Sequence, residues 1–212
     1  MKAVILDVDG VLVDSEYYWD RSRRAILREA GVPDSFDDLE VRGMNIDDQY
    51  DYLSERFELE VEREGFVGLY DRRAEKVYYQ KAELLSCFEE IQELVREEEL
   101  KFGLVSASPR RWIEMVLDRF GLEEKFDIVV TANDIDGPSK PDPAIYLHAA
   151  EELGVEPENC VAVEDSENGL RSASEAGMKT VGFRHSELQD LRDADEVVDS
   201  EEDVYEAVRE LV

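Results

Sequence analysis

The chain has 212 residues, of which 43% are hydrophobic, so it is long enough for one substantial core with a smaller insertion. Its 54 Asp and Glu face only 24 Lys and Arg, and the formal net charge of −30 makes nucleic acid and anionic membrane surfaces poor partners. Two cysteines exclude a disulfide framework, and no apolar run reaches the roughly 20 residues of a membrane helix, so we expect a cytoplasmic protein.

The first predicted element is a short strand over residues 3–6 that leads into Asp7-Val-Asp9-Gly10. A fully apolar strand of this length is typical of the buried interior of a parallel sheet. Ligands of open α/β sheets bind at the carboxyl ends of such strands, and residues two apart on a strand face the same way. Asp7 and Asp9 are therefore either a cation site or carboxylates that are simply solvated or cap a loop. The same two aspartates interrupt the apolar start and argue against a signal peptide.

Residues 15–83 are polar and have helical periodicity, with no convincing strand. We predict one helix ending before Gly31, a second over 46–57 and a third over 62–79. The aromatic residues of this stretch are expected to form its core. The pattern predicts a helical cap domain at residues 15–83, inserted into a core domain made of residues 1–14 and 84–212.

Strands and helices then alternate to the end of the chain. Strands are predicted at 102–106, 126–130, 160–163, 180–183 and 196–198, and helices at 88–97, 109–120, 143–153, 168–176 and 203–212. Single helices between strands indicate βαβ units with right-handed crossovers. The predicted fold class is α/β, a Rossmann-like parallel sheet with helices on both faces plus the helical cap.

Polar groups follow several of these strands or precede a helix. They are Asp7 and Asp9, Ser106-Ala107-Ser108, Lys140 within the loop 138–143, and Glu164-Asp165-Ser166. Each signal alone is weak, because Lys140 could be a surface lysine and Asp165 or Ser166 could be a helix N-cap. Strand ends of a parallel sheet converge, so we expect the groups to share one crevice.

This set of groups suits phosphoryl transfer. Asp7 and Asp165 can hold Mg²⁺, a hard cation that prefers oxygen ligands. Lys140 and the metal would neutralise phosphoryl charge, and the Ser106 hydroxyl can hydrogen-bond a phosphoryl oxygen. One carboxylate can act as nucleophile to form an aspartyl-phosphate, and a second can act as general acid and base.

The order of the motifs resembles the haloacid dehalogenase superfamily, in the branch of beta-phosphoglucomutase-like phosphatases. The resembling motifs are Asp7-Val-Asp9-Gly-Val-Leu-Val-Asp-Ser-Glu16, Ser106-Ala-Ser, Ser-Lys140-Pro-Asp-Pro and Val-Glu164-Asp165-Ser-Glu-Asn-Gly169. The resemblance covers essentially the whole chain, and the four motifs together are far more specific than any one.

The resemblance implies a role for each matching residue. It makes Asp7 the nucleophile and a Mg²⁺ ligand, and Asp9 the general acid and base that also gives its backbone carbonyl to the metal. It implies that Ser106, Ala107 and Lys140 bind the phosphoryl group that is transferred. It makes Asp165 a metal ligand and Glu164 either a ligand or a carboxylate that orients Lys140 or a metal-bound water. The dehalogenases of the superfamily lack the second aspartate, so Asp9 argues against carbon–halogen cleavage.

Two departures separate the subclasses. Mutases of this branch have a His where this chain has Trp19, and a cap Arg where it has Ile46, although Arg42 is near. The preferred hypothesis is therefore a Mg²⁺-dependent phosphatase of a small phosphorylated metabolite, with a sugar phosphate as the candidate substrate. The alternatives are a sugar-phosphate mutase and a non-catalytic binding protein. We expect a monomer or a weak homo-oligomer.

The charge composition suggests a second property. The basic residues comprise 17 Arg and only 7 Lys, beside a large excess of acid. This pattern resembles proteins adapted to molar salt, in which the Debye length of about 3 Å screens self-repulsion. The alternative is an ordinary acidic cytosolic protein.

Overall fold

The structure is a computed structural model that describes residues 1–185 and 189–212. Its centre is a six-stranded sheet in the order β3-β2-β1-β4-β5-β6, with every neighbouring pair parallel. The strands are β1 (Ala3–Asp7), β2 (Lys101–Ser106), β3 (Ile128–Thr131), β4 (Cys160–Glu164), β5 (Lys179–Phe183) and β6 (Glu196–Val198). The strand order changes direction at β1, which places the end of β1 between the ends of β2 and β4.

Helices cover both faces of the sheet, as predicted. On one face α6 (Ala144–Leu153) and α7 (Glu167–Glu175) pack against the side of β1 that carries Ala3 and Ile5. On the other face, α4 (Cys87–Glu97), α5 (Arg110–Phe120) and α8 (Glu201–Leu211) share a core with Val4 and Leu6. Successive β1 side chains alternate between the two cores, because neighbouring strand residues point to opposite faces.

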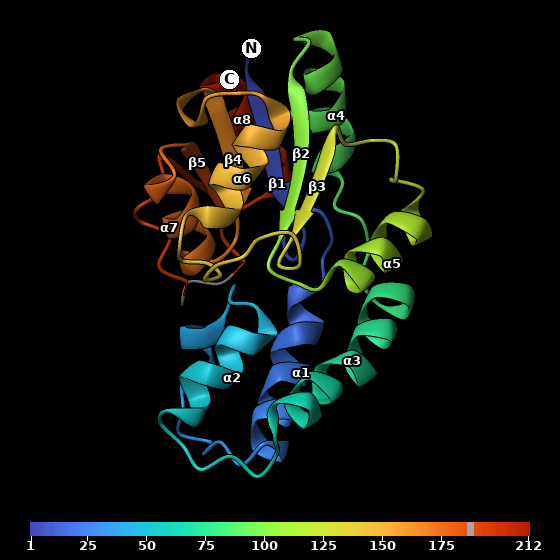
Figure 1. Ribbon diagram of the computed structural model, residues 1–212. Coiled ribbons are helices and arrows are strands. Elements are labelled where there is room, and N and C mark those ends of the chain that lie inside the picture. Colours follow the sequence, from blue (N-terminus) through green and yellow to red (C-terminus); the bar gives the residue numbers. More distant parts are fainter. Residues whose placement is uncertain (186–188) are drawn as a thin grey trace.

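A helical insertion lies between β1 and β2. It contains α1 (Glu16–Glu29), the 3₁₀ turn η1 (Asp38–Val41), α2 (Ile46–Ser54) and α3 (Arg63–Gln80). Within residues 15–83, all of which the structure describes, no strand is assigned. Figure 1 shows these helices facing the carboxyl ends of the strands, with both termini at the opposite end of the sheet. The insertion is therefore placed over the sheet edge where ligands of α/β proteins bind.

Most predicted elements are confirmed to within two residues, but α2 ends earlier than predicted. It ends at Ser54 rather than Phe57. The Phe57 ring makes an edge-to-face contact with Phe36, 5.6 Å between ring centroids, outside the regular helix. The Phe57 N–H still donates to the Leu53 carbonyl at 2.8 Å, so the chain past Ser54 is an irregular last turn, and the prediction of a regular helix to Phe57 is wrong by three residues. The short turns η1 and η2 (Pro157–Asn159) have no counterpart among the predictions.

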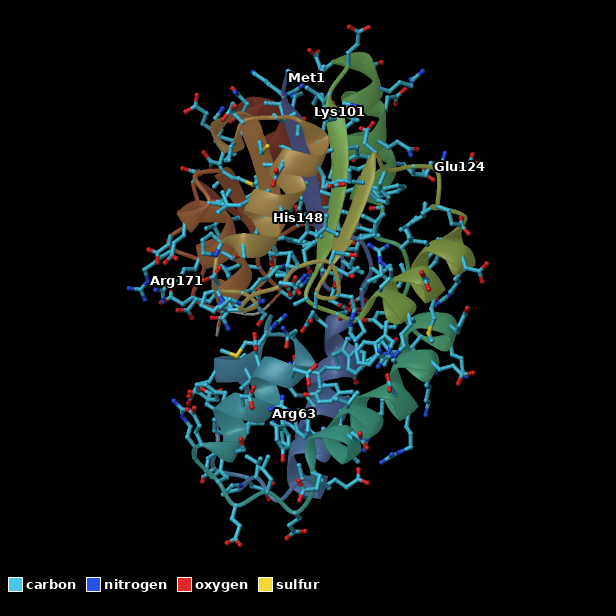
Figure 2. The ribbon with its side chains drawn as sticks, in the orientation of Figure 1. Met1, Arg63, Lys101, Glu124, His148 and Arg171 are labelled. Atoms are coloured by element: carbon cyan, nitrogen blue, oxygen red, sulfur yellow. The ribbon has the colours of Figure 1, made fainter. Side chains whose placement is uncertain are left out.

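Side chains fill the space between the sheet and the insertion. In Figure 2 Arg63 lies in the insertion and Lys101 near the far end of the sheet, with the side chains of both parts meeting between them. Among the described residues, no helix is both long and apolar enough to cross a bilayer. The boundaries of a separate cap domain, 15–83, stay a prediction.

Candidate active site

The ends of three adjacent strands bring the predicted polar groups together. β1 is paired with β2 on one side and β4 on the other, so Asp7, Ser106 and Glu164 end neighbouring strands. All three are buried, with exposed fractions of 7%, 2% and 0%. The first motif turns sharply after Asp9, where Gly10 has φ +78°. A Cβ at Gly10 would lie 2.5 Å from Asp165 Oδ2, so the turn requires glycine both for its conformation and for this close approach.

Lys140 is the buried cation beneath these strand ends. Its Nζ donates to Asp7 Oδ1 at 2.6 Å and to Glu164 Oε1 at 2.5 Å, and the side chain is 2% exposed. Burial alone favours a neutral amine, but the carboxylates of Asp7 and Glu164 outweigh it and raise the pKa of Lys140 above its usual value. The ammonium therefore stays charged at any physiological pH. The Tyr146 hydroxyl also donates to Glu164 Oε1, at 2.6 Å, which fixes that carboxylate from below.

An acidic triad surrounds the lysine. Carboxylate oxygens of Asp7, Glu164 and Asp165 lie within 4.8 Å of one another, and all three residues are buried. Burial raises the pKa of Asp7 well above its usual value, and repulsion from Glu164 adds to this while Lys140 opposes it. Crowded buried carboxylates of this kind are stabilised by a bound cation, and carboxylate oxygens are the ligands that hard divalent cations prefer.

Charge counting around the site supports the same conclusion. Carboxylates outnumber basic side chains around the cavity. The carboxylates are Asp7, Asp9, Glu16, Glu164 and Asp165, and the basic residues are Arg23, Arg42 and Lys140. A bound cation would offset part of this negative charge, so the residues present fit a metal ion.

Arg42 connects the helical insertion to the triad. Its guanidinium contacts Asp165 Oδ2 at 2.5 Å and Glu16 Oε2 at 2.8 Å, and all three side chains are at most 10% exposed. Burial and the neighbouring Asp165 charge raise the pKa of Glu16 to about 8. Sequence analysis noted Arg42 only as lying near a position occupied in mutases. Nothing in the local pattern could reveal a contact between residues 123 positions apart.

Asp9 lies beside the triad and is held by hydroxyl groups. Ser15 Oγ donates to its carboxylate at 2.5 Å, Tyr78 OH lies 2.9 and 3.0 Å from its two oxygens, and Ser108 Oγ donates at 3.2 Å. Tyr78 belongs to α3 and is fully buried. Burial and the nearby Asp9 charge raise the pKa of Tyr78 well above its usual value, so the phenol keeps its proton. Sequence analysis placed this tyrosine only within a helix and missed the contact.

These groups line a single cavity of about 70 Å³. The predicted residues on its wall are Asp7, Asp9, Ser106, Ala107, Lys140 and Asp165; Glu164 lies behind them. Part of the wall is aromatic: Trp19 of α1 in the insertion and Trp112 of α5 in the core have rings stacked 5.4 Å apart at an angle of 19°. Sequence analysis expected the aromatic residues of 15–83 to form a core, and Trp19 is indeed buried, but it did not predict the contact of Trp19 with Trp112 at the site. The cavity thus has carboxylates and Lys140 at the sheet edge, and both aromatic and charged side chains, among them Trp19, Arg23 and Arg42, on the side of the insertion.

Comparison with known proteins identifies a family and several relatives. A family model for haloacid dehalogenase-like hydrolases matches residues 1–177. Hexitol phosphatase B of Escherichia coli K12 is 36% identical over 88% of this chain and 85% of its own length. A phosphorylated carbohydrates phosphatase of Thermotoga maritima is 32% identical over 88% of this chain and 87% of its own length.

Solved structures agree with the sequence matches. A beta-phosphoglucomutase of Clostridium difficile superposes with a TM-score of 0.80, at 27% identity, over 99% of this chain and 96% of that one. The parallel sheet and the helical insertion are therefore a shared architecture.

Proposed function

The chain belongs to the haloacid dehalogenase-like hydrolases, and from this premise we propose that it is a Mg²⁺-dependent phosphatase of small phosphorylated sugars or related metabolites. The resemblance predicted from the motifs is confirmed, and the phosphomonoesterase class is supported by relatives that carry phosphatase names. The observation that carries the proposal is the buried contact of Lys140 with Asp7, beside a triad that suits a divalent cation.

The proposed reaction begins on Asp7. One Asp7 carboxylate oxygen attacks phosphorus, the bond from phosphorus to the ester oxygen breaks, and Asp9 gives a proton to the departing alkoxide. Lys140 and the Ser106 hydroxyl stabilise negative charge on the phosphoryl oxygens, together with the backbone of Ala107. Asp9 then takes a proton from water, which attacks phosphorus and releases Asp7 and inorganic phosphate.

We assign the metal to Asp7, Asp165 and the backbone carbonyl of Asp9, with Glu164 as a further ligand or as the group that orients Lys140. When bound, Mg²⁺ would supply positive charge next to the phosphoryl oxygens. The burial of Gly10 against Asp165 supports this assignment, because only a glycine leaves room for the carboxylate.

A phosphatase is better supported than a mutase. Trp19, at the position of the mutase histidine, is 5% exposed and stacks on Trp112. Its indole N–H donates to Tyr78, and an indole cannot take over the proton transfer of an imidazole. A non-catalytic role is disfavoured by the intact set of Asp7, Asp9, Lys140 and Asp165.

We further propose a cytoplasmic location, a small-molecule partner and a salt-adapted surface; the oligomeric state stays a prediction.

The test is phosphate release from a panel of two- to six-carbon phosphate esters, with Mg²⁺ in high KCl. We expect release by the natural protein, its loss after chelation, and its loss in the isosteric variant Asp7→Asn. Asp14→Asn is the matched control, because this aspartate follows the same strand but is exposed. Equal activity of Asp7→Asn and the natural protein would exclude the aspartyl-phosphate route. Isomer interconversion primed with a sugar bisphosphate, without phosphate release, would instead favour the mutase.

A further inference from the structure

The carboxylate of Asp9 is surrounded by three hydroxyl groups. Oδ1 is within hydrogen-bond distance of Ser15 and Tyr78, and Oδ2 of Tyr78 and Ser108. Ser15 precedes α1 and Tyr78 lies near the end of α3, so these two hydroxyls stand where the chain enters and leaves the helical insertion. Ser108 follows β2 in the core. The Asp9 side chain is thus held at the boundary between the two parts of the molecule.

Tyr78 is the only one of these three hydroxyls that reaches both Asp9 oxygens, and its own orientation is fixed. Trp19 Nε1 donates to the Tyr78 hydroxyl at 3.1 Å, and both rings are buried. An indole N–H can only donate, so the tyrosine oxygen must act as its acceptor. The phenolic proton is then left to point at Asp9. The Trp19 indole is in turn held by its stack on Trp112.

We propose that Tyr78 is a positioning residue, which holds the Asp9 carboxyl in the orientation needed for proton transfer to the leaving group. This inference rests on the proposed phosphatase function. A carboxyl group that rotates freely about its last bond spends little time in any one orientation, and a misplaced general acid loses much of its catalytic effect. Tyr78 restricts this rotation through one donor that bridges the two oxygens. Because Tyr78 belongs to the insertion, the placement of α3 sets the placement of the acid.

The leaving group of the substrate provides the test. A sugar alkoxide departs poorly without a proton, whereas p-nitrophenolate departs readily without one, so only the first depends strongly on a general acid. We therefore compare kcat/KM for a sugar phosphate and for p-nitrophenyl phosphate, since this constant reports the step in which the leaving group departs. Each variant is assayed at its own pH optimum.

For Tyr78→Phe we expect kcat/KM to fall about 10- to 100-fold with the sugar phosphate, a part of the effect of a general acid, and less than about threefold with p-nitrophenyl phosphate. Tyr79→Phe is the matched control, because the adjacent tyrosine is 43% exposed and touches only Asp118 among the described contacts. It should leave both constants unchanged.

A second variant protects the test against misfolding of the first. Trp19→Phe keeps an aromatic ring, although a smaller one, and leaves the Tyr78 hydroxyl in place while it removes the N–H that orients this hydroxyl. It should show the same ester selectivity with a smaller loss. Equal losses with both esters in a folded variant, or no loss with either, would overturn the positioning role alone. A natural protein inactive toward both esters would overturn the proposed function, and this inference with it.

Discussion

The ammonium of Lys140 lies 2.6 Å from Asp7 Oδ1, although the two residues are separated by 133 positions and are almost excluded from solvent. The same ammonium also reaches Glu164, so one buried cation serves two buried carboxylates. Removing the cation leaves both carboxylates without a positive charge beside them, which is far more costly than losing a surface ion pair.

We expect Lys140→Met to lower the free energy of unfolding by about 3–5 kcal/mol and to abolish phosphate release. Denaturant unfolding measures the first effect and the ester assay the second. The double variant Lys140→Met/Glu164→Gln also removes the charge of Glu164, so only the Asp7 carboxylate stays buried without a cation. Stability should therefore return in part, while activity stays absent. Lys125→Met, at an exposed lysine, should change neither. A fully stable single variant would contradict the role given to this ion pair.

Metal binding should depend on the acidic triad. We expect Asp165→Asn to weaken Mg²⁺ binding at least about tenfold, because an amide supplies a weaker oxygen ligand and no charge. Calorimetric titration with Mg²⁺ alone measures this without substrate. Asp136→Asn, at an exposed aspartate outside the site, serves as the control and should bind as the natural protein does. Unchanged affinity in Asp165→Asn would remove this residue from the metal site.

Asp134 lies in the loop that follows β3, and its protonation at low pH should destabilise this loop. Partial burial raises the pKa of this carboxyl, but hydrogen bonds from Thr131 and Arg110 outweigh burial and lower it below 3.8. A carboxyl whose pKa is lower in the folded state stabilises the protein above the unfolded-state pKa, and this contribution is lost as the pH falls through the folded-state pKa. The stabilisation is therefore complete at neutral pH and disappears below about pH 4.

We expect Asp134→Asn to lose about 1–2 kcal/mol of stability at pH 7, the usual contribution of hydrogen bonds to a charged group. The difference in the free energy of unfolding between the variant and the natural protein should shrink as the pH is lowered from 4 to 3. Unfolding curves at several pH values measure this difference. A difference that stays constant over this range would show that ionisation of Asp134 does not stabilise the fold.

The net charge of −30 should make stability depend on salt. The Debye length falls from about 8 Å at 0.15 M salt to about 3 Å at 1 M. Repulsion among the carboxylates should therefore weaken, and the melting temperature should rise steeply with KCl. Glu97→Gln/Glu98→Gln removes two charges from an exposed acidic run and should reach the same melting temperature at lower KCl. A flat dependence would make the protein an ordinary acidic one.

Sequence patterns predicted the sheet and its polar edge because those features depend on local chemistry. Apolar residues 3–6 require a buried strand, and the helices preceding Gly121 and Gly154 end there with positive φ, as glycine allows. Asp7, Lys140 and Asp165 could be assigned to one edge because parallel strand ends must converge.

Contacts between distant segments could not be predicted in the same way. Arg42 reaches Asp165, and Tyr78 reaches Asp9, only after the insertion has settled on the sheet. A periodic pattern shows that Tyr78 is buried but not what its hydroxyl meets. The contact of Phe57 with Phe36 is likewise one between segments that the local pattern does not connect.

Asp165 takes part in two interactions at once, the acidic triad and the ion pair with Arg42. A cation bound to this carboxylate would therefore change the strength of one contact between the insertion and the sheet. Thermodynamic linkage makes such an effect reciprocal: the factor by which the cation alters the Arg42–Asp165 contact equals the factor by which that contact alters the affinity for the cation. A mutation of Arg42 would accordingly be felt by a metal ion that Arg42 does not touch.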